Sequence, residues 1–213
     1  MNNNLTELIF ILDRSGSMQD LATETINGFN SLVEKQKHTG NAFLTTVLFD
    51  NDYELLHDHI DIRQVPTLTS NEYYARGCTA LLDAIGRTIN SVGNRLSQTP
   101  EEARPGKVIC TITTDGLENA SSKYSLSEIK EMITHQRNVY KWEFIFLGAN
   151  IDAIETAESI GISRKRAKTY TASPDGCRST FSVMDKMLNY MKLSDSDDDF
   201  YDDDCEDILS EIQ

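Results

Sequence analysis

Three short segments of the sequence carry small oxygen-bearing side chains of the kind that bind hard metal ions. The first is Asp13-x-Ser15-x-Ser17, directly after a run of five apolar residues, and the second holds Thr79 at the start of an amphipathic stretch. In the third, Asp115 follows another apolar run. Mg²⁺ takes oxygen ligands in an octahedron at roughly 2.0–2.1 Å and keeps several waters. These segments therefore predict one divalent-cation site, provided that the fold brings them together.

Each segment alone has a simpler explanation. Asp and Ser after a strand are ordinary helix N-caps, as Thr79 could be, and an Asp-Gly pair is a common turn. Taken together, however, all three lie where strands end or helices begin. In an open α/β sheet, that edge holds the crevice in which ligands bind. The set contains no His or Cys, which disfavours zinc or copper.

The elements that must position these segments follow from the hydrophobic pattern. Short apolar runs alternate with amphipathic stretches, which predicts a doubly wound α/β fold with a mostly parallel sheet and helices on both faces. The run 50–52 between two strands is too short for a crossover, so those strands form an antiparallel hairpin. Ser125 and Glu128 form a capping box at the start of one helix. The expected strands are 7–13, 43–49, 53–62, 107–114, 142–147 and 167–171, and the expected helices are 19–37, 79–96, 125–137, 152–160 and 181–193.

The three segments resemble the metal-ion-dependent adhesion site (MIDAS) of von Willebrand factor A (vWA) domains, in order and at suitable spacing. Residues 114–119 and 146–150 also resemble a bacterial or phage branch of that family. The resemblance covers about residues 5 to 193. Two departures are minor, because Cys78 precedes the threonine and Leu117 separates Gly116 from Glu118.

The resemblance implies six strands in the order 3-2-1-4-5-6 with strand 3 antiparallel, which agrees with the hairpin. It implies that Ser15 and Ser17 bind Mg²⁺ or Mn²⁺ directly, and that Asp13 holds metal-bound water. Thr79 would bind directly in the high-affinity state and through water otherwise, with Asp115 behaving in the opposite sense. An Asp or Glu carboxylate of a partner protein would complete the ion, since neutral hydroxyl ligands leave it much of its charge.

A binding module is therefore expected rather than an enzyme. Catalysis would need a general base in reach of a water nucleophile, and no His, Lys or Cys recurs in the three segments. A metal-dependent phosphatase is one alternative, although such sites carry a second carboxylate where this chain has Ser15. A scaffold with a non-functional metal site is the other.

The bulk composition is that of one soluble domain. The chain has 213 residues with 39% hydrophobic and 25% charged residues, and no apolar run long enough to span a bilayer. The N-terminus lacks a signal-peptide pattern and the four Cys residues have no CxxC spacing, so a cytoplasmic location is expected. Nucleic-acid binding needs clustered Lys and Arg, whereas the net charge is −14.

Acidic residues concentrate at the C-terminal end. Ten of the 34 acids and no Lys or Arg lie within 194–213, which predicts a vWA domain over 1–193 and a disordered, solvated tail over 194–213. A calcium loop beginning at Asp195 is a weaker interpretation, because Phe200 stands where such a loop needs Gly. The tail could also supply the carboxylate for self-association. The basic run 164–166 is either a solvated loop or a docking patch for an acidic segment such as this tail.

A second group with ligand chemistry lies on the expected strand 53–62. Strand periodicity would put His57, His59 and Asp61 on one face. They could form a transition-metal cluster, but polar groups on an edge strand that protect it against aggregation explain them better.

Overall fold

A six-stranded sheet forms the centre of the molecule. The computed structural model describes residues 1–194 and 201–212. Its strands run in the order β3-β2-β1-β4-β5-β6, and β3 is antiparallel to β2 while all other pairs are parallel. This confirms the predicted fold class and strand order. The strands are β1 (Asn2–Asp13), β2 (Asn41–Phe49), β3 (Tyr53–Asp61), β4 (Pro105–Thr114), β5 (Glu143–Ala149) and β6 (Ala167–Tyr170).

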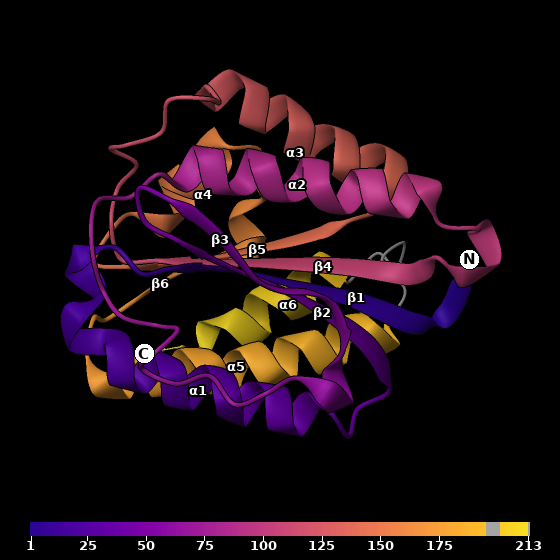
Figure 1. The fold of residues 1–213 in the computed structure, drawn as a ribbon, viewed down its shortest axis with the longest axis horizontal. Helices are drawn as coiled ribbons and strands as arrows, with labels where there is room; N and C mark the ends of the chain where they lie inside the picture. Colours follow the sequence, from indigo (N-terminus) through magenta and orange to yellow (C-terminus); the bar gives the residue numbers. More distant parts are fainter. Residues whose placement is uncertain (195–200, 213) are drawn as a thin grey trace.

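Helices cover both faces of the sheet (Figure 1). One layer contains α1 (Ala22–Gln36), α5 (Pro174–Leu193) and α6 (Tyr201–Ser210), and the other contains α2 (Leu81–Gln98), α3 (Leu126–Tyr140) and α4 (Ala153–Ser159). Alternate side chains of β1 enter separate cores, with Phe10 in the α1–α5 layer and Ile9 and Ile11 in the α2–α3 layer. The chain is therefore doubly wound, and the carboxyl ends of β1 and β4 meet at one edge.

Several element boundaries differ from the sequence prediction. β1 begins at Asn2 because its backbone pairs with Pro105, whatever the polarity of its side chains. α5 begins at Pro174, where Ser173 caps the helix by accepting from Gly176 N. The capping box of Ser125 and Glu128 is present as predicted. Short 3₁₀ turns connect the larger elements at η1 (Gly16–Leu21), η2 (Ile62–Gln64), η3 (Glu101–Ala103) and η4 (Arg164–Arg166).

The acidic C-terminal stretch differs most from its prediction. Instead of a disordered tail, the described part forms α6 and packs against α5 and η4. Its apolar side chains recur at helical spacing and are buried in the α1–α5 core: Tyr201, Cys205, Leu209 and Ile212. The suggested calcium loop begins in 195–200, outside the described residues.

The basic run at η4 is the docking patch for this helix. The Arg166 guanidinium lies 2.6 Å from Asp202 Oδ1, Lys165 pairs with Asp203, and Lys186 of α5 pairs with Glu211. Arg166 also lies over the Tyr201 ring, with Cζ 4.5 Å from the centroid. Part of the acidic segment is thus held by cations of its own chain.

His57, His59 and Asp61 do not share a face of β3. The register with β2 shifts between Leu44 and Val47, and His59 has a left-handed backbone with φ of 53°. His57 is buried and stacks on Phe29 of α1, whereas His59 Nδ1 lies 2.7 Å from Glu7 Oε2. This irregularity breaks the period of two on which the cluster depended.

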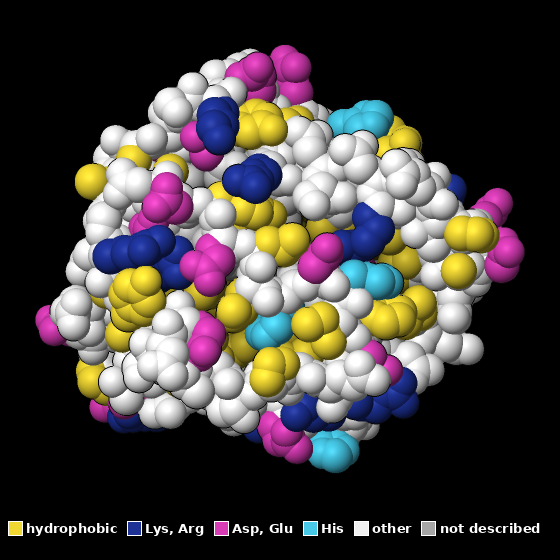
Figure 2. Space-filling model, viewed as in Figure 1, with side chains coloured by type: hydrophobic (Ala, Val, Ile, Leu, Met, Phe, Trp, Pro, Cys, Tyr) yellow, Lys and Arg dark blue, Asp and Glu magenta, His cyan; other side chains and the backbone are white. Residues whose placement is uncertain are grey.

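The surface over β3 carries mixed charge. Figure 2 shows Lys and Arg side chains interspersed with Asp and Glu on this face. None of the described helices is long and apolar enough to cross a membrane.

Candidate metal centre

The first loop of the site, residues 13–17, brings two serine hydroxyls close to the buried Asp13. β1 ends at Asp13, whose Oδ1 accepts a hydrogen bond from Ser15 N at 2.6 Å, so the chain bends back over the carboxylate. Ser15 Oγ and Ser17 Oγ are 3.1 Å apart. Tyr73 donates its hydroxyl to the Asp13 carbonyl from below the loop. The two serine oxygens therefore lie side by side at the carboxyl end of β1.

The third loop of the site begins at Asp115, directly after β4. It lies beside the first loop because β4 is the neighbour of β1 in the sheet. Thr114 Oγ1 at the end of β4 donates to Asp13 Oδ2 at 2.6 Å. Asp115, the next residue, accepts from Ser17 Oγ at 2.5 Å. Both Asp13 oxygens are thus engaged, and Asp115 faces the serines across the gap between the two loops.

The second loop brings Thr79 to the same place. A Cβ added to Gly116 would lie 2.9 Å from Thr79 Oγ1 and 3.6 Å from Ser17 Oγ, so both hydroxyls crowd around this glycine. The Thr79 backbone is held from the third loop, since Asn119 Oδ1 accepts from Thr79 N at 2.9 Å and Asn119 N donates to Thr79 O at 3.1 Å. The Thr79 hydroxyl itself makes no hydrogen bond to a described residue. It is available to a ligand.

An ion-pair cluster around the buried Asp50 connects the first and second loops of the site. Asp50 lies in the β2–β3 turn, and its Oδ2 lies 3.0 Å from Arg14 Nε and 2.6 Å from Arg76 Nε. The backbone joins the same parts, because Arg76 N donates to Arg14 O and Ala80 N donates to Asp50 O. Burial alone would raise the pKa of Asp50, but its hydrogen bonds and the two arginines hold it below the ordinary value. Arg14 also pairs with Glu54, so the two arginines and two carboxylates of this cluster balance in charge.

The site carboxylates lack such compensation. Burial raises the pKa of Asp13 to about 6, against the opposing hydrogen bonds from Thr114 and Ser15. Burial also raises the pKa of Asp115, although Ser17 donates to it. No Lys, Arg or His of residues 1–194 and 201–212 forms an ion pair with either one. A buried and a half-buried carboxylate among three neutral hydroxyls suit a hard cation, which would supply the missing charge.

All five predicted site residues therefore meet at one place: Asp13, Ser15, Ser17, Thr79 and Asp115. Sequence reasoning missed the supporting residues. Asn119 accepts from Thr79 N, and Glu118 accepts from Leu82 N at 2.9 Å. Both residues follow the turn after Asp115, so their polar side chains were a signal in the sequence. The pairing of Arg14 with Asp50 had no such signal. Within the described residues, no group of three or more His, Cys, Asp or Glu is placed to hold a metal.

Comparison with known proteins identifies the fold. No family model and no curated protein matches the chain. The chain resembles the vWF domain of the type V pili tip protein Mfa5 from Porphyromonas gingivalis, with 12% identity and a TM-score of 0.62 over 92% of this chain and 98% of that one. The chain has the vWA fold.

Two further solved structures agree in fold but are longer. Proximal thread matrix protein 1 from the mussel byssus, with a zinc-occupied MIDAS motif, matches at 17% identity and a TM-score of 0.61 over 86% of this chain and 46% of that one. A von Willebrand factor type A protein from Catenulispora acidiphila matches at 14% identity and a TM-score of 0.59 over 84% and 42%. The chain therefore spans less than half the length of these two.

Proposed function

We propose that this domain is a metal-dependent protein-binding module whose divalent cation, Mg²⁺ or Mn²⁺, is completed by an Asp or Glu carboxylate of a partner protein. Ser15, Ser17 and Thr79 would hold the ion, with Asp13 and Asp115 supplying negative charge around it. The observation that carries the proposal is the meeting of three loop hydroxyls with the buried Asp13 and the half-buried Asp115, neither of which pairs with a cation among the described residues.

The donor set favours a further acidic ligand. Hydroxyl oxygens are neutral, and Asp13 is already engaged by Ser15 N and Thr114 Oγ1, so it acts from behind the serines. An ion held in this way keeps much of its positive charge. A carboxylate arriving from outside would then form a charge-assisted contact in a partly dry site.

The rim of the site indicates what surrounds that carboxylate. Leu117 follows Gly116 and is 62% exposed. An apolar side chain next to the partner's acid would cover Leu117 and remove its surface from water. We expect the partner to present an acidic residue flanked by an apolar one.

Calorimetry with Mn²⁺ tests the metal site. Wild type is expected to bind one ion, and Asp13→Ala is expected to lose binding because the central carboxylate is gone. Asp20→Ala is the matched control, since Asp20 is an exposed acid in the following 3₁₀ turn. Equal affinity in wild type and Asp13→Ala would refute the site.

Completion by a carboxylate needs a separate measurement. Mn²⁺ bound to an excess of protein is expected to accelerate the proton relaxation of acetate more than that of acetamide, because only acetate carries the charge that the ion retains. Ser17→Ala should reduce the difference by weakening metal binding. A metal-bound protein that relaxes both molecules equally would retain the metal site and refute the carboxylate ligand.

The two alternative functions make different predictions. A phosphatase would hydrolyse p-nitrophenyl phosphate with Mg²⁺, and a scaffold with a non-functional site would bind no ion in calorimetry. We expect neither result, because the site offers hydroxyl ligands without a placed general base.

A cytoplasmic location remains a prediction. Self-association through the C-terminal acids is disfavoured for Asp202, Asp203 and Glu211, which pair with cations of their own chain.

A further inference from the structure

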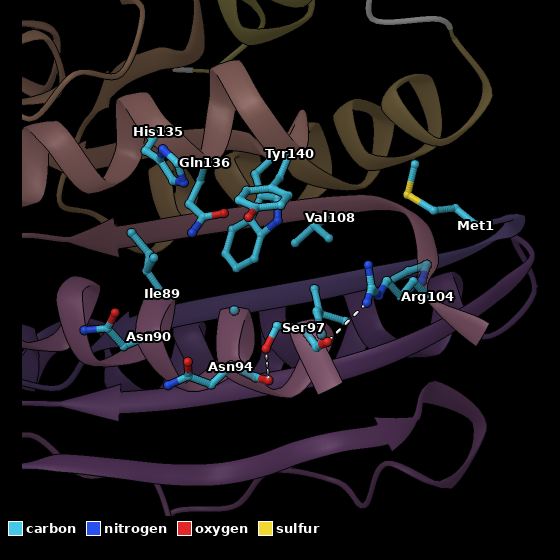
Figure 3. Close-up of a pocket in the computed structure, with 14 residues that line it drawn as sticks. Met1, Ile89, Asn90, Asn94, Ser97, Arg104, Val108, His135, Gln136 and Tyr140 are labelled. Atoms are coloured by element: carbon cyan, nitrogen blue, oxygen red, sulfur yellow. Dashed lines mark hydrogen bonds between the residues drawn. The ribbon is translucent and has the colours of Figure 1, made fainter. Parts of the chain in front are cut away.

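A second candidate site lies between α2 and α3, near the amino ends of β1 and β4. Its cavity has a volume of about 290 Å³, at the lower end of the range for small-molecule pockets. Figure 3 shows Asn90 and Asn94 of α2 facing His135 and Gln136 of α3, with Val108 of β4 between the helices. The metal site lies at the opposite, carboxyl ends of these strands, so the two sites are separate.

A glycine keeps the cavity open. Gly93 lies within α2 and lines the cavity, and a Cβ added there would meet only Gln136 Nε2, at 3.7 Å. Glycine inside a helix destabilises it relative to alanine, and nothing in the local packing requires the smaller residue. A larger side chain at this position would project into the cavity.

The lining combines aromatic faces with unused donors. Trp142 is buried, at 4% exposed, yet it lines the cavity, and its indole N–H donates to no described residue. The His135 and Tyr140 rings meet edge to face, with centroids 5.5 Å apart. Aromatic surfaces of this kind bind a planar ring, and the indole N–H offers it a hydrogen bond.

Arg104 contributes positive charge to the cavity. Arg104 closes one end and donates through Nε to Thr99 O at 2.7 Å. It also donates through Nη2 to Ser97 O at 3.1 Å (Figure 3). A guanidinium has five N–H donors, so further donors are left for a ligand. The described residues that line the cavity include no Asp or Glu, and none of the chain's described carboxylates pairs with Arg104. The described lining therefore offers positive but no negative side-chain charge to a ligand.

We propose that this cavity binds a small aromatic carboxylate, with the ring against Trp142 and Tyr140 and the carboxylate on Arg104. The volume fits one ring, the aromatic lining binds its faces, and the guanidinium pairs with the acid. This site is independent of the proposed metal site and of any protein partner.

Phenylacetate is the probe, and Trp142 is the reporter because the chain contains one Trp. With selective excitation of tryptophan, the fluorescence of Trp142 is expected to change saturably as phenylacetate is added. The Kd should be on the order of 1 mM, as expected for a ligand of this size. The single indole cross-peak in a ¹⁵N–¹H spectrum should shift in parallel. Phenylacetamide, which has the same shape without the charge, is expected to bind about tenfold more weakly.

Two variants locate the ligand. Gly93→Leu fills the cavity and should abolish the response, whereas Ser91→Leu, on the exposed side of the same helix, should leave it unchanged. Arg104→Gln should reduce phenylacetate affinity to that of phenylacetamide, with Arg87→Gln of α2 as its control. Circular dichroism shows whether each variant is folded. If Gly93→Leu does not fold, the proposal is tested by Arg104→Gln with its control Arg87→Gln, and by the comparison of phenylacetate with phenylacetamide.

Three results would overturn the proposal. The first is the absence of a saturable response to phenylacetate in wild type. The second is equal affinity for phenylacetate and phenylacetamide, which would make the cavity apolar without selectivity for charge. The third is undiminished binding in folded Gly93→Leu or Arg104→Gln protein.

Discussion

Acidic residues of this molecule have opposite surroundings in two regions, the helix α6 and the candidate metal site. In α6, Asp202 and Asp203 pair with the cations of η4, and Tyr190 donates to Asp204. At the carboxyl edge of the sheet, Asp13 and Asp115 are buried or half-buried without any described cation against them. One group of acids attaches a helix to the protein, and the other leaves a charge to be balanced from outside.

The difference shows that acid content alone does not locate a metal site. The C-terminal stretch has far more carboxylates, but its cations are already supplied by Lys165 and Arg166. The loop site has only two carboxylates, and burial makes each costly to ionise. The number of acids left without a partner is the better indicator of a cation site.

The largest expected effect concerns the structural role of α6. Leu209 is 2% exposed in the α1–α5 core, so Leu209→Ala should lower the free energy of unfolding by about 2–5 kcal/mol. Glu206→Ala, on the exposed side of the same helix, should have little effect. Urea unfolding in EDTA measures both. Equal stability of Leu209→Ala and wild type would mean that the acidic stretch is a solvated tail after all.

The next effect tests the missing charge at the loop site. Mg²⁺ or Mn²⁺ at about a hundred times its Kd should raise the free energy of unfolding by about 2.7 kcal/mol, because the ion binds only the folded state. Asp13→Ala should abolish the gain, while Asp202→Ala should retain it. Thermal unfolding with and without metal gives the comparison. Retention of the gain in Asp13→Ala would place the ion elsewhere.

In the metal-free protein, the free energy of unfolding should depend on pH through Asp13 of the candidate metal site. The pKa of Asp13 rises from 3.8 to about 6 on folding, because burial penalises the ionised form. The folded state therefore binds this proton more tightly, and the free energy of unfolding should rise as the pH falls from about 8 to about 5. Asp13→Asn should remove about 1–1.5 kcal/mol of that change.

Denaturant titrations of wild type and Asp13→Asn in EDTA across this range provide the test. The α6 acids are outside the substitution and cancel in the difference. Metal affinity should show the reverse trend and weaken below about pH 6, where a proton competes for Asp13. A pH profile identical in the two proteins would show that Asp13 is compensated in the folded state.

The smallest effect is expected for the hydroxyl ligands. Thr79 and Ser17 cap no helix, so replacing either by Ala should cost less than about 1 kcal/mol in EDTA. Metal affinity should nevertheless fall, because each substitution removes one oxygen ligand. Unfolding in EDTA and Mn²⁺ calorimetry on the same variants distinguish the two roles. A large stability loss without metal would make these hydroxyls structural.

The apolar runs predicted the core strands and the three motifs predicted which side chains would meet, whereas the strand order was implied by the family resemblance. Both succeeded because strand burial and strand-end loops are local properties of the sequence. α6 was missed because its apolar side chains at positions 201, 205, 209 and 212 are separated by acids. The acidic composition led to a prediction of disorder, which did not use the helical spacing of these buried side chains.

Other features depend on contacts between distant residues. The buried pairing of Arg14 with Asp50 joins positions 36 residues apart and depends on how β2 lies beside β1. The opposite directions of His57 and His59 depend on a register shift that no residue type announces. Local pattern therefore predicted the loops that carry the candidate site, and tertiary pairing determined what supports them.

The paired hydrogen bonds between Asn119 and Thr79 have a consequence for engineering. Because these bonds join the second loop to the third, the threonine cannot be grafted onto a new scaffold without the segment that follows Asp115. A transplant that copied only the five oxygen-bearing residues would leave Thr79 free to drift by its own backbone motion. A graft of this site therefore needs all three loops, including Asn119, whose hydrogen bonds join the second loop to the third.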